Sequence, residues 1–184
     1  MDLQAAKQNL LEVKAIFDRL KVKFWLDAGT LLGAVRDKNF IPWDKDIDIR
    51  MLAKDWNPSI CKEFRKKNFG CGKTMLHKRY PGKVSQGFFF KRHIRTDAGL
   101  NYYYPPENIY VNLPIAPYRE NATRPARFYR GDCFIKFLGT KFRVPNPPVE
   151  CVEWAYGKNW RTPKDIAYLW ARTRVSMDKY LKYF

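Results

Sequence analysis

Residues 25–36 read WLDAGTLLGAVR and residues 40–49 read FIPWDKDIDI, and these two stretches decide the fold. In the second stretch, Asp46 and Asp48 alternate with isoleucines, a pattern typical of a half-buried strand whose carboxylates share one face. The first stretch places a Gly-Thr pair where a short strand turns into a helix. Their order and separation predict that the start of this helix and the two carboxylates face one ligand.

Gly29 and Thr30 are predicted to bind phosphate oxygens, because the first N–H groups of a helix and its dipole attract anions. Asp46 and Asp48 are predicted to share Mg²⁺ or Mn²⁺, since hard divalent cations prefer carboxylate oxygens. A cation bridging phosphates that are held by backbone donors indicates phosphoryl-transfer chemistry. Asp44 lies two residues before Asp46 and is interpreted either as an outer ligand on the same face or as a turn-forming residue.

Arg36 lies near the end of the predicted helix, one to two turns beyond the Gly-Thr pair. Its guanidinium can hold a phosphate by a forked contact and stabilise a leaving nucleotide, or it can cap the last carbonyl groups of the helix. The aromatic runs at residues 88–90 and 102–104 are interpreted as core residues of strands, with stacking on a base or sugar as the alternative.

These stretches resemble the signature of the LicD family, which includes bacterial phosphocholine transferases and fukutin-related ribitol-phosphate transferases. The motif residues are Leu26–Arg36 and Ile41–Asp48, and the resemblance continues through Tyr110–Ile115 and Phe142–Pro147 to Tyr156–Trp160. It implies a nucleotidyltransferase fold of the DNA polymerase beta type. Lys45 departs from the family pattern, at a position that varies among fukutin-related members.

By this resemblance, Asn112 stands where the family has the third carboxylate of its metal site. An Asn offers a carbonyl oxygen to a cation but no negative charge, so a weaker second metal or reduced activity follows. Asp97 and Glu107 lie upstream, and nothing in the sequence places either in the site. Lys158 is a phosphate contact only by the resemblance, since Gly157 before it is typical of a helix end.

The resemblance implies a metal-dependent transferase that moves phosphocholine or a polyol phosphate from a CDP-type donor to a glycan hydroxyl. Asp46, Asp48 and Arg36 are then its catalytic residues. Two alternatives stay open. The first is a nucleotidyltransferase that uses a nucleoside triphosphate on RNA or a small molecule, and the second is a non-catalytic relative that binds glycan or nucleic acid.

The formal net charge is +17, and residues 61–184 carry +16 of it, because residues 1–60 hold 10 Lys and Arg against 9 Asp and Glu. Such a field favours a polyanion, an anionic membrane surface or nucleic acid as partner, whereas a basic solubilising surface is the simpler interpretation.

The four cysteines lack metal-ligand spacing and are predicted to be reduced. With neither a signal peptide nor a membrane-spanning apolar run, the expected location is cytoplasmic or peripheral to a membrane.

The chain of 184 residues is predicted to form a single α+β domain with a mixed sheet flanked by helices. Within it we expect an N-terminal helix over residues 3–20, a catalytic core over 24–160 and a C-terminal helix over 163–184. The expected core elements are strands at 24–27, 46–51, 73–80, 84–95, 109–115 and 134–144, and helices at 30–37, 57–67 and from Asn146.

Overall fold

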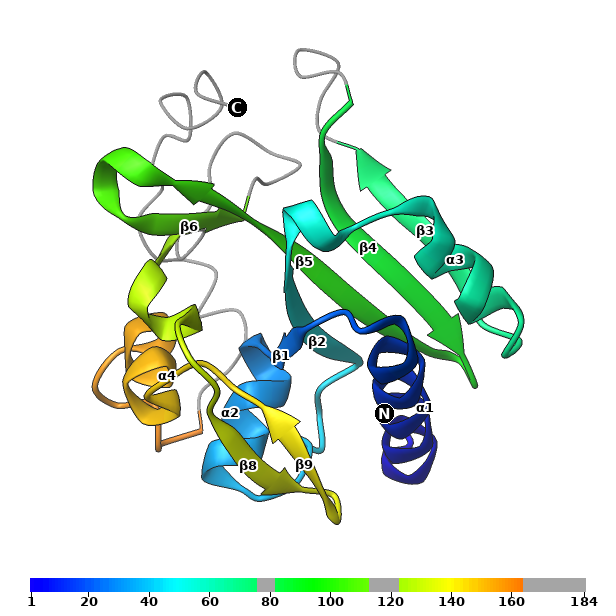
Figure 1. Ribbon diagram of the computed structural model, residues 1–184. Helices are drawn as coiled ribbons and strands as arrows, with labels where there is room; N and C mark the ends of the chain where they lie inside the picture. Colours follow the sequence, from blue (N-terminus) through cyan, green and yellow to red (C-terminus); the bar gives the residue numbers. More distant parts are fainter. Residues whose placement is uncertain (76–81, 113–122, 164–184) are drawn as a thin grey trace.

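A computed structural model describes residues 1–75, 82–112 and 123–163, and its sheet and helices are drawn in Figure 1. The fold is α+β, as predicted. A seven-stranded mixed sheet has the order β1-β2-β5-β4-β3, with β6 paired to β5 and β7 paired to β6. Only β2 and β5 run parallel among these pairs. The strands of this sheet are β1 (Phe24–Leu26), β2 (Asp46–Leu52), β3 (Gly70–Met75), β4 (Val84–Lys91), β5 (Ile94–Tyr104), β6 (Ile109–Asn112) and β7 (Thr123–Pro125). A separate two-stranded sheet pairs β8 (Phe134–Phe137) with β9 (Thr140–Arg143).

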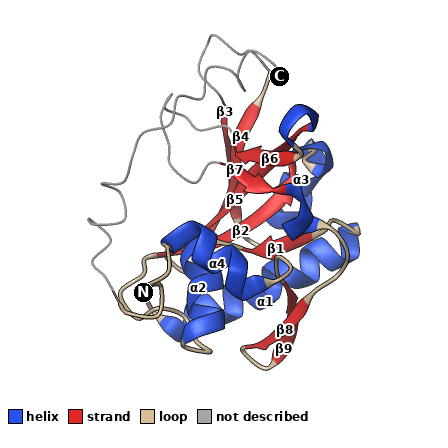
Figure 2. Ribbon diagram, turned by 90° about the vertical axis from the view of Figure 1, so that its left-hand side faces the viewer, coloured by secondary structure: helices blue, strands red, loops and turns tan. Residues whose placement is uncertain are grey.

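Four α-helices flank the sheet in the described part of the chain, and Figure 2 shows them from the side. On one face, Phe17 and Phe64 pack against Phe89, with the Phe64 and Phe89 rings stacked at 3.7 Å between centroids. On the other side of β1 and β2, α2 packs against α4. The helices are α1 (Leu3–Leu20), α2 (Ala28–Arg36), α3 (Pro58–Arg65) and α4 (Pro148–Tyr156), and the short 3-10 turns are η1 (Ala53–Asp55), η2 (Pro105–Glu107) and η3 (Ala126–Tyr129).

Local chemistry explains where the helices begin. α1 begins after Asp2, whose carboxylate accepts hydrogen bonds from the N–H groups of Gln4 and Ala5. α3 begins after Asn57, whose side chain accepts from Ser59, with Pro58 in the first position. None of the helices in the described residues has the length and apolar character needed to span a bilayer.

The strand predicted over residues 84–95 begins at Val84 as expected but ends at Lys91, because the chain reverses at Arg92 and His93. Both residues have positive φ angles, 53° and 59°, which lets them form a tight turn between β4 and β5 without a glycine. The result is a second long strand, β5, that the sequence did not predict over residues 96–104. It lies in the middle of the sheet between β2 and β4.

The strand predicted from residue 73 begins earlier, at Gly70, so that Gly70 and Gly72 both lie in β3. A Cβ atom at Gly72 would lie 2.4 Å from the ring of Phe88, so the missing side chain lets that ring lie on the β3 backbone. The C-terminal helix predicted over residues 163–184 and the end of the strand predicted over 109–115 fall outside the described residues.

The prediction that all four cysteines are reduced is corrected by a disulfide between Cys61 in α3 and Cys71 in β3. Cys133 and Cys151 are free. The two paired residues are ten positions apart, and only the turn from α3 into β3 brings their Cα atoms to 5.4 Å. Disulfides are rare in cytosolic proteins, so the cysteines no longer support a cytoplasmic location.

Replacing Cys61 and Cys71 together by Ser is expected to lower the free energy of unfolding by about 2–3 kcal/mol, because the cross-link limits the unfolded chain. Urea denaturation measures this loss. A reducing agent should lower the stability of the wild type equally and leave the double variant unchanged. Cys133→Ser is the control, and a wild type insensitive to reductant would contradict the pairing.

Candidate metal centre

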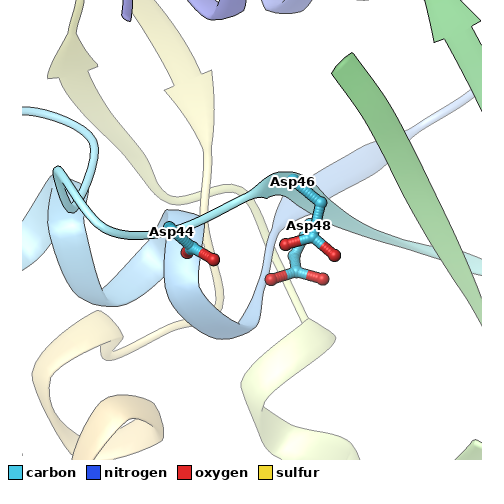
Figure 3. Close-up of side chains that lie close together, drawn as sticks. All are labelled: Asp44, Asp46 and Asp48. Carbon is cyan, nitrogen blue, oxygen red and sulfur yellow. The ribbon is translucent and has the colours of Figure 1, made fainter. Parts of the chain in front are cut away.

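Three carboxylates converge where the loop after α2 enters β2, as Figure 3 shows. Asp44, Asp46 and Asp48 each offer an oxygen atom within 4.8 Å of the others. Asp46 and Asp48 share a face because they alternate with the buried Ile47 in β2, and Asp44 extends the same row. The structure therefore brings together the two predicted ligands and the residue whose role the sequence left open.

A fourth carboxylate, Asp97 of β5, lies directly beside Asp48 in the parallel register of β2 and β5. Burial raises the pKa of both Asp48 and Asp97. The charge of Asp97 adds to the rise at Asp48, and the charge of Asp46 adds to the rise at Asp97. Asn112, the predicted third ligand, lies elsewhere: it pairs with Asn101, four residues along β5, or about 13 Å at the rise of a strand. Its amide donates to the carbonyl oxygens of Ser85 and Leu100.

The cluster carries unbalanced negative charge. Burial raises the pKa of Asp48 well above its usual range, and repulsion from Asp46 adds to this effect. Burial followed by repulsion from Asp44 raises the pKa of Asp46. Several carboxylates can stay ionised this close together only when a cation joins them. Oxygen donors in this arrangement fit Mg²⁺ or Mn²⁺, which makes the cluster a candidate metal centre.

The Gly-Thr pair holds Asp48 in place. The N–H of Gly29 donates to Asp48 Oδ2 at 3.2 Å, and the backbone N–H of Asp48 donates to Thr30 Oγ1 at 2.9 Å. A Cβ at Gly29 would lie 2.2 Å from Asp44 Oδ2, so only glycine leaves room for that carboxylate. The start of α2 and the carboxylates thus lie side by side as predicted, while phosphate binding by Gly29 and Thr30 stays a prediction.

A buried ion pair lies behind the acidic cluster. Asp27, which precedes α2, accepts hydrogen bonds from Arg50 of β2, and their side chains are 4% and 13% exposed. Burial alone would raise the pKa of Asp27, but the charges of Arg50 and Arg124 outweigh burial and lower it. The charge of Asp27 is therefore matched from within the protein, whereas Asp44, Asp46 and Asp48 form no ion pair with any described residue.

The remaining predicted site residues, Arg36 and Lys158, form no hydrogen bond or ion pair with the three carboxylates of the cluster. Arg36 donates from Nε and Nη2 to the carboxylate of its neighbour Asp37, both at 2.8 Å, and its side chain is 10% exposed. Lys158 is exposed beyond the end of α4 and has no hydrogen bond or ion pair with any described residue. Tyr156, at the end of α4, is a site neighbour that the sequence did not single out. Burial raises the pKa of its hydroxyl, and the nearby charge of Asp48 raises it further.

The chain is similar to proteins of one family. Residues 21–147 match the model of a family described as LicD/FKTN/FKRP, nucleotidyltransferase domain. The chain is 25% identical over 179 residues to human ribitol-5-phosphate transferase FKTN, covering 87% of this chain and 34% of that protein. It is 54% identical over 95 residues to the lipopolysaccharide cholinephosphotransferase LicD of Haemophilus influenzae, covering 49% of this chain and 35% of that protein.

The chain thus spans about a third of the length of these relatives. Among solved structures, the lincosamide adenylyltransferase LnuA is similar, with a TM-score of 0.50 and 14% identity over 75% of this chain and 78% of that chain. At this identity the likeness shows the fold alone, and it confirms the predicted nucleotidyltransferase fold.

Asp48→Asn is expected to stabilise the metal-free protein near neutral pH. In the folded protein the pKa of Asp48 is raised above its ordinary 3.8, so its contribution to stability is present below 3.8 and is lost as pH rises through the raised value. Thermal melts in EDTA at a series of pH values measure this effect. The melting temperature of Asp48→Asn should exceed that of the wild type by a margin that grows as the pH rises above 3.8. Added Mg²⁺ should raise the melting temperature of the wild type more than that of the variant. A variant less stable than the wild type in EDTA at neutral pH would rule out the repulsion.

Gly29→Ala is expected to weaken Mg²⁺ binding by roughly tenfold, because the new methyl group would force the Asp44 carboxylate away from its place. Calorimetric titration with Mg²⁺ measures the change. Gly70→Ala is the matched control, since a Cβ there meets the nearest atoms at an ordinary 3.6 Å. Equal affinities in the wild type and Gly29→Ala would show that Asp44 is not a ligand.

Proposed function

The chain belongs to the LicD/FKTN/FKRP family, and from this premise we propose that it is a metal-dependent transferase of substituted phosphate groups. The proposed reaction moves phosphocholine or a polyol phosphate from a CDP-type donor to a glycan hydroxyl. The names of its relatives support the group transferred, since one is a ribitol-5-phosphate transferase and another a cholinephosphotransferase. The observation that carries the proposal is the cluster of Asp44, Asp46 and Asp48.

Asp46 and Asp48 would hold Mg²⁺ or Mn²⁺, with Asp44 and Asp97 beside them. When bound, the cation supplies charge that offsets the negative charge of a diphosphate and of the nucleotide that leaves. The protein itself supplies position: Gly29 and Thr30 fix Asp48, so its oxygens are aimed before a substrate arrives. Arg36 is proposed to stabilise the leaving nucleotide and Lys158 to contact phosphate, as predicted from the sequence.

A screen of donors tests the proposal. The protein is incubated with CDP-choline, CDP-ribitol, CDP-glycerol or nucleoside triphosphates, each with Mg²⁺ or Mn²⁺, and the released nucleotide is measured. Release of CMP from a CDP conjugate supports the phospho-alcohol transferase. Release of pyrophosphate from a triphosphate would instead identify a nucleotidyltransferase, and binding without turnover would identify a non-catalytic relative.

The choice between Asp97 and Asn112 as the third ligand is also testable. We expect Asp97→Asn to reduce turnover and Mg²⁺ affinity together, with a loss on the order of 10²-fold or more in rate, since it removes a charge beside Asp48. Asn112→Ala should lower stability, because it removes donors to two carbonyl oxygens, while Mg²⁺ affinity stays the same. The reverse pattern would place Asn112 at the metal, as the sequence predicts.

A further inference from the structure

Arg95 lies in the row of β5 that faces the acidic cluster. In the parallel register of β2 and β5 it stands beside Asp46, and Asp97 stands beside Asp48. Side chains at alternate positions share a face, so Arg95 and these acids project from the same side of the sheet. Arg95 Nε donates to Asp97 Oδ1 at 2.5 Å. One edge of the guanidinium is thereby fixed to a carboxylate of the cluster.

The plane of the guanidinium is fixed as well. It lies over the ring of Phe88, with its central carbon 4.7 Å from the ring centroid. Phe88 in turn lies against β3 at Gly72, where a Cβ would come within 2.4 Å of the ring. Backbone, aromatic ring and guanidinium therefore form three stacked layers next to the acids. Stacking on an aromatic face restricts an arginine without using any of its hydrogen-bond donors.

These contacts leave the Nη hydrogen-bond donors of Arg95 unused. Only Nε is hydrogen-bonded, and neither Nη group has a partner among residues 1–75, 82–112 and 123–163. The side chain is 46% exposed, so the free edge of the guanidinium is open to solvent. Arg36, the arginine selected from the sequence, is different: its side chain is 10% exposed and both Nε and Nη2 are occupied by Asp37.

We propose that Arg95 is a substrate-binding residue whose two Nη groups hold a phosphate of the molecule bound at the metal centre. Neighbouring strands are about 4.8 Å apart, so a phosphate contacting a cation on Asp46 lies within reach of the adjacent Arg95. A planar fork of N–H donors matches two oxygens of one phosphate. Asp97 and Phe88 orient the fork, which reduces the entropy lost on binding. The assignment rests on the proposed function, since it needs a phosphate substrate.

The expected signature separates this role from a structural one. Arg95 is a cation beside Asp46 and Asp97, so its removal leaves Mg²⁺ affinity unchanged or raises it. A phosphate ligand would lose its fork and bind more weakly. A residue that only supports the cluster would weaken both kinds of ligand together. Because the charge of Arg95 alone would also favour an anion, the decisive variant is one that keeps the charge: weaker phosphate binding with unchanged Mg²⁺ affinity in Arg95→Lys indicates a direct contact.

The experiment is calorimetric titration with Mg²⁺ alone and then with pyrophosphate at saturating Mg²⁺. Arg95→Lys keeps the charge but loses the fork, and we expect about tenfold weaker pyrophosphate binding; Arg95→Ala should lose on the order of 30-fold. The matched control is Arg92→Lys, three residues away in the same hairpin, where the guanidinium is held by Asn9 and Glu12. Its pyrophosphate affinity should equal that of the wild type.

Pyrophosphate affinity equal to wild type in both Arg95 variants would overturn the assignment, as would a parallel loss of Mg²⁺ affinity or a wild type that binds no pyrophosphate. Failure of the proposed function looks different. If no CDP conjugate is turned over while pyrophosphate binding still depends on Arg95, the donor is wrong and the assignment of Arg95 stands.

Discussion

The parallel pairing of β2 with β5 is the contact on which the candidate site depends. It sets Asp48 beside Asp97 and Asp46 beside Arg95, so four charged side chains from two distant segments occupy one patch of the sheet. A shift of one residue in this register would turn every side chain of β5 to the opposite face. Register is well determined here because the residues between the charged ones, Ile47 and Thr96, are fully buried. The packing of the core thus sets the geometry of the acids.

A second constraint ties the start of α2 to the same two strands. Asp27 makes no cap hydrogen bond to α2, because its carboxylate is held by Arg50 of β2. Arg50 fits there only because Gly99 of β5 lacks a side chain, since a Cβ would lie 2.5 Å from Nη1. Removing either partner would leave a buried charge unpaired, which costs several kcal/mol, so Asp27 and Arg50 hold each other in position. Asp44, Asp46 and Asp48 have no such partner among the described residues, which marks them as the place for an external cation.

Short stretches of sequence were sufficient to predict the elements whose formation depends on neighbouring residues. Alternation predicted β2 with Asp46 and Asp48, and Asn57 with Pro58 predicted the start of α3. The tight turn at Arg92 and His93 lacks the glycine or asparagine that usually reveals a hairpin, so β5 was hidden and Asp97 had no predicted place. The Cys61–Cys71 pair likewise depends on how α3 meets β3. What escaped prediction was long-range register, which no short stretch of sequence encodes.

The charge of the site is opposite in sign to that of the rest of the molecule. The protein carries a net charge of +17, yet four carboxylates are concentrated where β2 meets β5. At distances within the Debye length of about 8 Å the acids dominate and attract a cation, whereas the surplus of Lys and Arg governs the approach of an anion. With the cation bound, the local repulsion is removed and both fields favour a phosphate ligand. Binding of metal before phosphate is then the order that costs least, and Arg95, which is exposed and lies beside Asp46, is a fixed cation available to such a phosphate.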